Sequence, residues 1–374
     1  MLDALYNYNR LCGIWPEQNR IEDVLKLTIN IGIVMYVLIG IILYMLHVMS
    51  DPVANITTIT DSLYSAQCCS NFCFNYIGCI VLRKTSMKFF KNVCNFELFG
   101  APSTLKKVDA HLNRNVKILV AYCFAASVSV NIYYLVTYYS WMKKHEEAYE
   151  IHHCSYACCT YYPYNYNSGI SLVFHTALSA YGFILLCFTG ILYICASYCG
   201  IEYMVVKIEH LKDMVSEVLI IDDPYRTLQG LKLCIRYHIH IISLADELNE
   251  CYSIISTPAI FFYSATLGIC FFSMTEKYTT KALLVIVGYI LAAFILGVCG
   301  QKLADTSESL GFSAYSMEWY DADLSIRQYI LFIITRSQKP LTYQAGSFGA
   351  FSLPVFMNII RGAYTYMTMQ SNMK

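Results

Sequence analysis

The chain has 374 residues, of which 57% are hydrophobic and only 14% are charged, about half the charge content of a typical soluble domain. Its 26 basic and 26 acidic side chains cancel, which argues against a nucleic-acid partner because binding to phosphates requires a basic face. The composition also excludes a secreted enzyme, a disordered protein and an ordinary cytosolic domain, and it indicates a multi-pass membrane protein.

Seven stretches are long enough to cross a bilayer as helices, which takes about 20 apolar residues. Six contain no Asp, Glu, Lys or Arg, and the seventh contains only Arg361. In chain order the predicted spans are residues 27–50, 62–82, 118–142, 168–201, 251–275, 282–301 and 348–373. We therefore expect an all-α, seven-transmembrane helical membrane protein.

The lysines and arginines predict an inverted topology. Twenty of them fall on the side of the amino terminus and five on the opposite side, and the basic side of a membrane protein is cytosolic. The amino terminus is thus predicted to be cytosolic and the carboxyl terminus extracellular. The glycosylation acceptor Asn55 falls in a loop assigned to the outside, although such a triplet also arises by chance and this one is close to the membrane.

Helical periodicity continues beyond the fourth span. Ile208, Leu211, Val215 and Val218 recur at spacings of three and four, and a second apolar stripe runs from Leu228 into the fifth span. We predict that spans four and five continue into a small cytosolic helical bundle. The alternative is two helices lying on the membrane surface.

The seventh element is predicted to be split. A helix starts at Asp323 and stops before Pro340, and a membrane half follows from residue 353. The expected divisions are a cytosolic amino-terminal segment (1–26), transmembrane helices 1–4 (27–201), cytosolic helices (202–250), transmembrane helices 5–6 (251–301), the cytosolic first half of helix 7 (302–347) and its membrane half (348–374).

No motif for catalysis or cofactor binding is found, neither a phosphate-binding glycine loop nor a zinc-protease or serine-hydrolase signature. Cys154, Cys158 and Cys159 lie in a polar loop, but the paired two-residue gaps of a zinc site are missing. They form a disulfide or remain free thiols. We expect no enzyme activity, no catalytic residue, no metal and no cofactor.

A small set of uncharged polar side chains lies within the spans. Those in the predicted outer half of the membrane are Tyr64, Gln67, Asn131, Tyr134, Tyr138 and His175, and Asn71, Tyr263 and Tyr289 are further polar residues of spans two, five and six. An apolar cavity with a few hydroxyls and amides suits a small, largely hydrophobic ligand. Hydrogen bonding between helices is the alternative role for each residue.

Arg361 is the one strong charge inside a predicted span. A central arginine is costly in a membrane, so it should face protein or water. It either extends to the cytosolic surface or lines a water-filled vestibule.

The carboxyl-terminal residues resemble the end of insect odorant receptors in order and spacing over some fifty residues. The matching positions are Trp319-Tyr320, Arg327, Arg336 to Leu341, Ala345 to Phe348, Leu353, Phe356, Ile360, Ala363 to Tyr366 and Thr368. Pro354 and Ser347 depart from the usual pattern, and the proline makes a bend possible there.

The resemblance implies a ligand-gated, non-selective cation channel in the plasma membrane of an olfactory neuron dendrite. In the family, an odorant-recognising subunit assembles with a shared odorant co-receptor in a heterotetramer, and the cytosolic helices form its anchor. The co-receptor has a much longer second cytosolic loop than residues 202–250, so this chain is similar to the odorant-recognising subunit. Its expected partners are a small volatile odorant, with an aromatic one suggested by the many tyrosines, co-receptor subunits, lipid and permeating cations.

The resemblance also implies where the pore and the odorant pocket lie. The pore is lined by the membrane half of the last helix, and the positions matching its gate are Met369, Asn372 and Met373. The pocket lies in the outer half of spans two, three, four and six, which contains the polar set above and extends to Tyr289.

Three other classes of membrane protein are weighed against this one. A related gustatory receptor shares the channel architecture, but the segment 336–348 favours the odorant branch. A G-protein-coupled receptor conflicts with the charge asymmetry, and a solute carrier would show internal repeats.

Overall fold

The computed structural model of the chain describes residues 2–15, 21–50, 56–142, 160–163, 169–221, 223–275, 279–317, 319–346 and 349–372. The helices in these ranges are α1 (Asp3–Leu11), α2 (Ile21–Ser50), α3 (Ile56–Val81), α4 (Arg83–Val93), α5 (Leu105–Met142), α6 (Gly169–Leu219), α7 (Pro224–Thr275), α8 (Thr279–Tyr315), α9 (Leu324–Ser337) and α10 (Leu353–Asn372). In the described parts, β pairing is limited to a bridge between Gln344 and Ala350. The predicted all-α class is confirmed.

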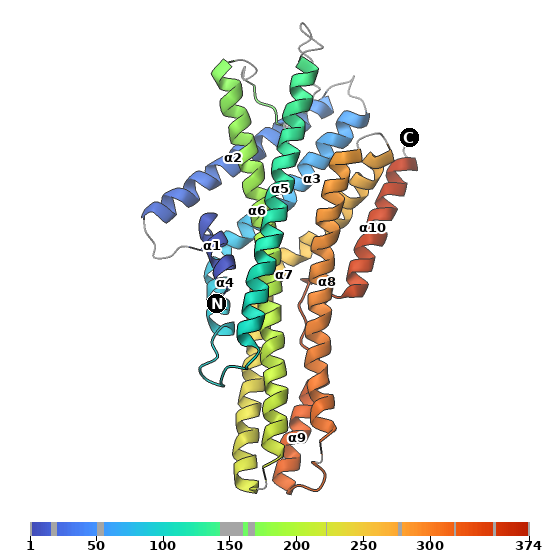
Figure 1. Cartoon of the computed structure of the whole chain (residues 1–374). Coiled ribbons are helices and arrows are strands. Elements are labelled where there is room, and N and C mark those ends of the chain that lie inside the picture. Colours follow the sequence, from blue (N-terminus) through green and yellow to red (C-terminus); the bar gives the residue numbers. More distant parts are fainter. Residues whose placement is uncertain are drawn as a thin grey trace.

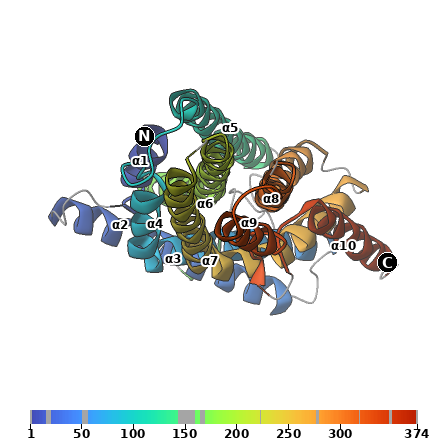
Figure 2. The same ribbon diagram turned by 90° about the horizontal axis from the view of Figure 1, so that it is seen from below.

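The molecule is elongated, with α6, α7 and α8 running along most of its length (Figure 1). At the lower end of that view these three helices are joined by α9, and at the upper end α2, α3, α5 and α10 widen the bundle. Seen from below, α2 and α10 lie at opposite edges and α6, α7 and α9 near the centre (Figure 2). The carboxyl-terminal end of α10 lies at the upper end, whereas the amino terminus lies near mid-height.

All seven predicted spans coincide with helices, namely α2, α3, α5, α6, α7, α8 and α10. Among the described residues, five of these helices are long and apolar enough to cross a membrane: α2, α5, α6, α7 and α8. α3 contains several Ser, Thr, Asn and Gln residues and α10 contains Arg361, which lowers their hydropathy. The second and seventh crossings stay predictions.

The continuation of spans four and five as helices is confirmed. α6 has 51 residues and α7 has 52, so each is about 75 Å long, more than twice the thickness of a hydrocarbon core. Along α7 the buried residues Leu231, Ile241 and Leu248 fall on the predicted apolar stripe or beside it. α9 begins directly after Asp323, where a helix start was predicted. The cytosolic placement of these parts stays a prediction.

The sequence analysis did not identify α1 or α4. α1 packs against α5 and α6, and side chains of α5 bind its first backbone N–H groups. The amide nitrogen of Leu2 donates to Asp109 Oδ1 at 2.9 Å, and that of Ala4 donates to Asn113 Oδ1 at 2.9 Å. Asp109 also accepts a hydrogen bond from the Tyr203 hydroxyl of α6 at 2.7 Å. Because these contacts are more than 90 residues apart in sequence, local pattern does not reveal them.

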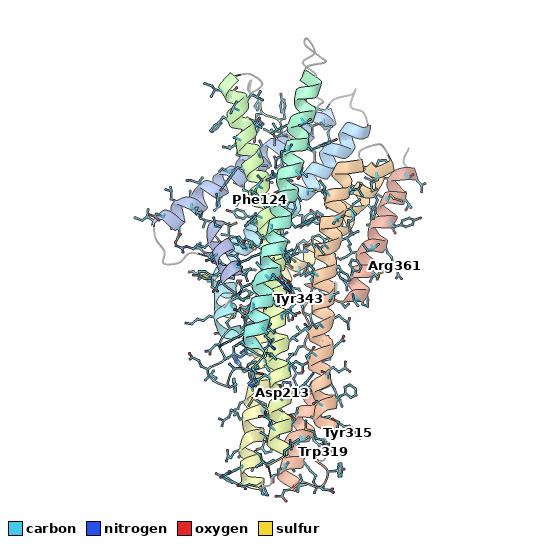
Figure 3. All side chains as sticks on the ribbon, viewed as in Figure 1. Phe124, Asp213, Tyr315, Trp319, Tyr343 and Arg361 are labelled. Carbon is cyan, nitrogen blue, oxygen red and sulfur yellow. The ribbon has the colours of Figure 1, made fainter. Side chains whose placement is uncertain are left out.

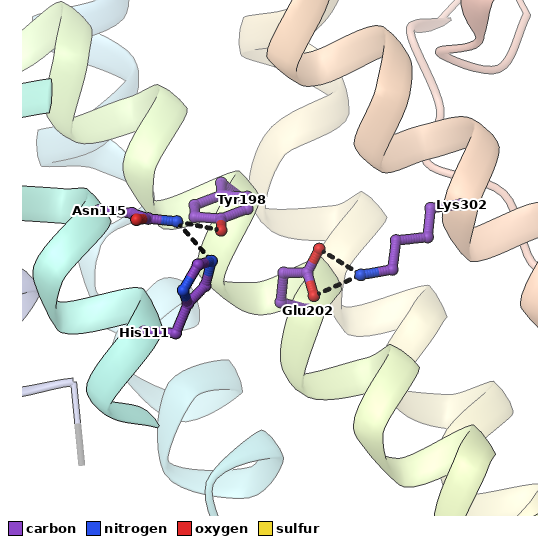
Figure 4. Close-up of polar contacts among 5 residues, drawn as sticks. All are labelled: His111, Asn115, Tyr198, Glu202 and Lys302. Atoms are coloured by element: carbon purple, nitrogen blue, oxygen red, sulfur yellow. Dashed lines mark hydrogen bonds and ion pairs between the residues drawn. The ribbon is translucent and has the colours of Figure 1, made fainter. Parts of the chain in front are cut away.

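Polar contacts join α5, α6 and α8 (Figure 4). Asn115 Nδ2 donates to the Tyr198 hydroxyl at 2.9 Å and lies 3.0 Å from His111 Nε2. One turn further along α6, both carboxylate oxygens of Glu202 accept hydrogen bonds from Lys302 Nζ at 2.8 Å. These contacts fix the relative register of three long helices.

The segment between α9 and α10 is bound to α7 through its backbone. Asn249 Nδ2 donates to the Thr342 carbonyl oxygen at 2.9 Å, and the amide nitrogen of Gln344 donates to Asn249 Oδ1 at 2.7 Å. Gly346 then turns the chain with a φ of 58°, a left-handed conformation that glycine adopts without strain. The segment therefore returns toward α7 and α8 before α10 begins.

Candidate ligand cavity

A cavity of about 150 Å³ lies between α3, α5, α6, α7 and α8. Its walls are mostly apolar. Helical spacing brings side chains of α3 to the cavity at intervals of three and four, at Cys68, Asn71, Phe72 and Asn75. Other lining residues are Leu119, Tyr122, Cys123, Ser127, Val130, Phe183, Cys187, Ile191, Tyr263, Leu284, Gly288, Tyr289 and Ala292.

A short hydrogen-bonded chain of polar groups lies on one wall. Asn71 Nδ2 donates to the Tyr289 hydroxyl at 3.2 Å, which links α3 to α8. Asn75, one turn further along α3, donates from Nδ2 to Asn71 Oδ1 at 3.5 Å. All three residues are at most 7% exposed, so these bonds form away from bulk solvent.

Aromatic rings complete that wall. Tyr263 of α7 meets Tyr289 edge to face, with ring centroids 5.3 Å apart and an interplanar angle of 89°. The ring centroids of Phe72 and Tyr289 lie 6.3 Å apart. Gly190 of α6 lets the Phe72 ring approach its backbone, because an added Cβ would lie 3.0 Å from that ring. Such a site is suited to a small apolar or aromatic molecule.

Of the residues predicted to bind ligand, the structure places Tyr289 in this cavity. Gln67 neighbours the lining residue Cys68 but does not line the cavity. Asn131 donates from Nδ2 to the Ser127 carbonyl oxygen of its own helix at 2.8 Å. This bond lies within one helix, so among the described residues Asn131 neither lines the cavity nor forms the bond between helices that was the alternative role.

His175 belongs to a different cluster, between α2 and α6. Its Nδ1 lies 2.7 Å from the Tyr36 hydroxyl, and its Nε2 lies 3.2 Å from Thr160 Oγ1. Tyr162 stacks on Tyr36 with ring centroids 4.6 Å apart and meets the histidine ring edge to face. The residue is 1% exposed, so the structure gives His175 a packing environment away from the cavity.

Several predicted positions lie outside the described residues. The side chains of Tyr64, Tyr134 and Tyr138 are among them, as are Asn55, the loop cysteines Cys154, Cys158 and Cys159, and Met373. Their proposed roles stay predictions.

Asn75, Tyr122 and Ser127 line the cavity but were not identified from the sequence. Asn75 could have been found, because it lies four residues after Asn71 and so on the same face of a helix. Tyr122 gave no such signal, since tyrosines occur throughout the chain.

On α10 the two described gate candidates are exposed. Met369 has an exposed fraction of 52%, and Asn372 ends the helix in an exposed position. Arg361 is also exposed and points away from the bundle (Figure 3). Pro354 lies in the first turn of α10, where its missing N–H is not needed, so it starts the helix instead of bending it.

These features define a class of protein: an all-helical, multi-pass membrane protein with an apolar cavity among its long helices. The chain matches the model of the 7tm Odorant receptor family over residues 100–364, and it belongs to that family. This is a family of receptors and not of enzymes.

Individual relatives agree with this assignment. Odorant receptor 67a of Drosophila melanogaster is 29% identical over 148 residues, which is 38% of this chain and 35% of that receptor. Putative odorant receptor 92a of the same species is 22% identical over 353 residues, covering 89% and 83%. The chain thus spans about a third of the length of the first relative and most of the second.

Solved structures share the fold. The olfactory receptor OR5 of Machilis hrabei in complex with eugenol superposes with a TM-score of 0.79 at 16% identity, covering 100% of this chain and 98% of that one. The same receptor without that ligand gives a TM-score of 0.78 at 15% identity, covering 99% and 97%.

Proposed function

We propose that this chain is the odorant-recognising subunit of a ligand-gated, non-selective cation channel in the plasma membrane. The observation that carries the proposal is the apolar cavity beside Tyr289 in a chain of the odorant receptor family. The related receptor OR5 is described in complex with eugenol, a small volatile aromatic molecule. A small volatile, aromatic or similarly apolar, is the ligand expected here.

One feature supports assembly with other subunits, and another concerns which subunit this chain is. Apolar side chains at the lower end of α8 are exposed, with exposed fractions of 70% for Phe312 and 67% for Tyr315, the second of which is labelled in Figure 3. Large exposed apolar surface is a mark of an interaction site. We assign residues 202–250 and 302–347 to a cytosolic anchor that contacts odorant co-receptor subunits in a heterotetramer. The turn between α6 and α7 is short, unlike the long loop expected of a co-receptor.

The pore is assigned to α10, with an apolar gate at Met369, Asn372 and Met373. Leu353, Met357, Tyr364 and Met369 are exposed on this helix in the single chain, as expected for a surface that faces a pore or a neighbouring subunit. A hydrophobic constriction can close by losing its water. Odorant binding opens it by favouring the open packing of the bundle, to the extent of its higher affinity for that state.

The test is whole-cell current in cells that express the chain with and without an insect odorant co-receptor, scanned with volatiles. We expect rapid cation currents that require the co-receptor and persist when G-protein signalling is blocked. The variant Gly288→Phe places a ring at a cavity position where an added Cβ meets no atom within 4 Å, and it should abolish the odour response.

Gly32→Phe on α2 is the matched control, because its Cβ also meets nothing within 4 Å but the position does not line the cavity. It should respond as the wild type does. Silence to all volatiles despite surface expression, or equal loss in both variants, would contradict the assigned function.

A further inference from the structure

Most polar groups that line the cavity have partners within the protein. Asn71 binds Tyr289 and Asn75, and Ser127 Oγ donates to the Phe124 carbonyl oxygen at 2.9 Å. Two groups differ: Asn75 Oδ1 and the Tyr122 hydroxyl are buried and have no hydrogen-bond partner among the residues that the structure describes. Asn75 is 2% exposed. One group lies on α3 and the other on α5, and both residues line the cavity.

Such pairs of unsatisfied groups are uncommon, because more than about 90% of buried polar groups in folded proteins are hydrogen-bonded. Leaving one unpaired is costly. Where unpaired groups line a cavity, the missing partner is either an ordered water molecule or a bound ligand. The orientation of the Asn75 amide follows from its donation to Asn71, which leaves Oδ1 as an acceptor that requires a donor.

The two groups together restrict the chemistry of that molecule. Asn75 Oδ1 only accepts, whereas the Tyr122 hydroxyl can donate or accept. A carbonyl or ether ligand offers acceptors alone and satisfies only Tyr122, and a hydrocarbon satisfies neither group. A cationic amine would be buried without a carboxylate, since the described residues that line the cavity include no Asp or Glu. A hydroxyl group fits both.

We propose that this cavity selects ligands that carry a hydroxyl on an apolar ring, with the hydroxyl bound by Asn75 and Tyr122. The inference rests on the function proposed above and adds the ligand class. The volume of about 150 Å³ matches that of an engineered cavity in another protein that binds benzene, so a ring with one short substituent is the expected size. Through Asn71 and Tyr289, the bound hydroxyl is connected to α8 as well as to α3 and α5.

The test uses benzyl alcohol, benzaldehyde and ethylbenzene, which have the same number of non-hydrogen atoms and differ only in the substituent. Two readouts are compared: odour-evoked current with the co-receptor, and thermal stabilisation of the purified full-length chain, which reports binding without channel opening. We expect benzyl alcohol to be about tenfold more potent than benzaldehyde and more still than ethylbenzene, as the loss of one or both hydrogen bonds implies.

Asn75→Leu should reduce the preference for benzyl alcohol over benzaldehyde about tenfold, because only the alcohol can donate to Asn75 Oδ1. Tyr122→Phe should reduce the preference for benzyl alcohol over ethylbenzene about tenfold and leave the preference over benzaldehyde intact, because both oxygen-containing ligands lose the same bond. Both variants should leave the response to ethylbenzene unchanged. Thr266→Val is the control, because the Thr266 hydroxyl is also buried and unpaired but does not line the cavity. It should leave the preference intact. Tyr122→Phe keeps the aromatic ring and should therefore fold, so the hydroxyl assignment can be tested with this variant even if Asn75→Leu does not fold.

Failure of the proposed ligand class and failure of the proposed channel function are distinguishable. Equal potency and equal stabilisation by all three molecules would overturn the hydroxyl assignment, with water as the partner of the two groups, while the receptor function stands. The absence of stabilisation by any of them would also overturn it. Absence of current to every volatile, despite stabilisation by benzyl alcohol, would count against the channel function and leave the ligand class in place.

Discussion

At the scale of single residues, Tyr343 connects the segment before α10 to the centre of the bundle (Figure 3). Its hydroxyl lies 3.1 Å from that of Tyr193, 3.0 Å from Ser197 Oγ and 2.9 Å from Ser256 Oγ. Its ring stacks on Phe351 with centroids 5.1 Å apart. One side chain thus joins α6, α7 and the carboxyl-terminal segment through a buried hydroxyl cluster.

We predict that Tyr343→Phe lowers the free energy of unfolding by about 1–3 kcal/mol, because it removes three buried hydrogen bonds and leaves the Ser197 hydroxyl without the partner it has in this cluster. Thermal unfolding of the detergent-purified protein measures the change. Tyr364→Phe on α10 is the control, since Tyr364 is 62% exposed and should have little effect. Equal shifts in both variants would contradict the importance of the cluster.

Lys207 of α6 is 1% exposed, and it lies beyond the predicted end of the fourth span at residue 201. Its Nζ donates to the Asn95 carbonyl oxygen at 2.7 Å and lies 3.9 Å above the Phe96 ring. Burial lowers the pKa of Lys207 to about 8, and the nearby Cys94 opposes this shift. The charge of this lysine is therefore only partly compensated.

A pH dependence of stability follows. Below pH 8 Lys207 is protonated in both the folded and the unfolded chain. Between about pH 8 and its ordinary pKa of 10.5, a larger fraction of Lys207 is protonated in the unfolded chain than in the folded chain. The free energy of unfolding contributed by Lys207 therefore rises with pH across this window.

The melting temperature of the wild type relative to Lys207→Met should accordingly increase from pH 8 to pH 10. Thermal unfolding in buffers across this range measures the difference, with Lys88→Met as the control because the Lys88 side chain is 68% exposed. His210 and His240 lie close enough to Lys207 to interact with its charge. Burial and this charge lower the pKa of both histidines, so they titrate below the range of pH 8 to 10. A constant difference across the range would contradict the prediction.

At the scale of elements, α10 and the segment before it pack directly against α7 and α8. Gly300 of α8 lies against the backbone of Phe351, and Gly268 of α7 lies against Tyr366, whose Cβ would be 2.8 Å from an added Cβ. Close approach of backbones requires glycine at these positions. The position of α10 is therefore set by small residues on two long helices.

We predict that Gly300→Ala lowers the free energy of unfolding by about 1–3 kcal/mol, because the added methyl group meets the Phe351 carbonyl oxygen and the backbone must shift. Gly288→Ala is a matched control in the same helix, where an added Cβ meets no atom within 4 Å. Alanine favours a helix by up to about 1 kcal/mol over glycine, so this variant should be neutral or stabilising. The same denaturation assay compares the two, and an equal loss in both would contradict the packing argument.

At the scale of the whole molecule, the orientation in the membrane rests on charge. Twenty lysines and arginines lie on the predicted cytosolic side and five on the other. The elongated end formed by α6, α7, α8 and α9 would then extend into the cytosol, and the carboxyl-terminal end of α10 would lie near the outer surface (Figure 1).

Epitope tags at the two termini should report this orientation. In intact cells an antibody should reach a carboxyl-terminal tag, and it should reach an amino-terminal tag only after the cells are made permeable. A tag on a cytosolic partner protein serves as the control for membrane integrity. The opposite pattern would contradict the inverted topology.

The helices that coincide with apolar runs could be predicted from the sequence, because a backbone inside a bilayer must satisfy its own hydrogen bonds whatever surrounds it. No such run marks α1 or α4, and they were missed. The site could be predicted only in part. Tyr289, expected to bind ligand, lines the cavity, whereas His175 faces Tyr36 and Thr160 in another part of the bundle. Both are polar residues in apolar stretches, and nothing local distinguishes them.

The sequence by itself determined the all-helical class, the long continuous α6 and α7, and the family, since these depend on apolar run length, spacing and a carboxyl-terminal motif. Only the tertiary structure decided which helix faces enclose the cavity and which groups, Asn75 and Tyr122 among them, line it. The rotation of each helix about its axis is set by contacts with helices distant in sequence, such as the bond from Asn71 to Tyr289, 218 positions apart. A local pattern of apolar residues carries no record of those contacts.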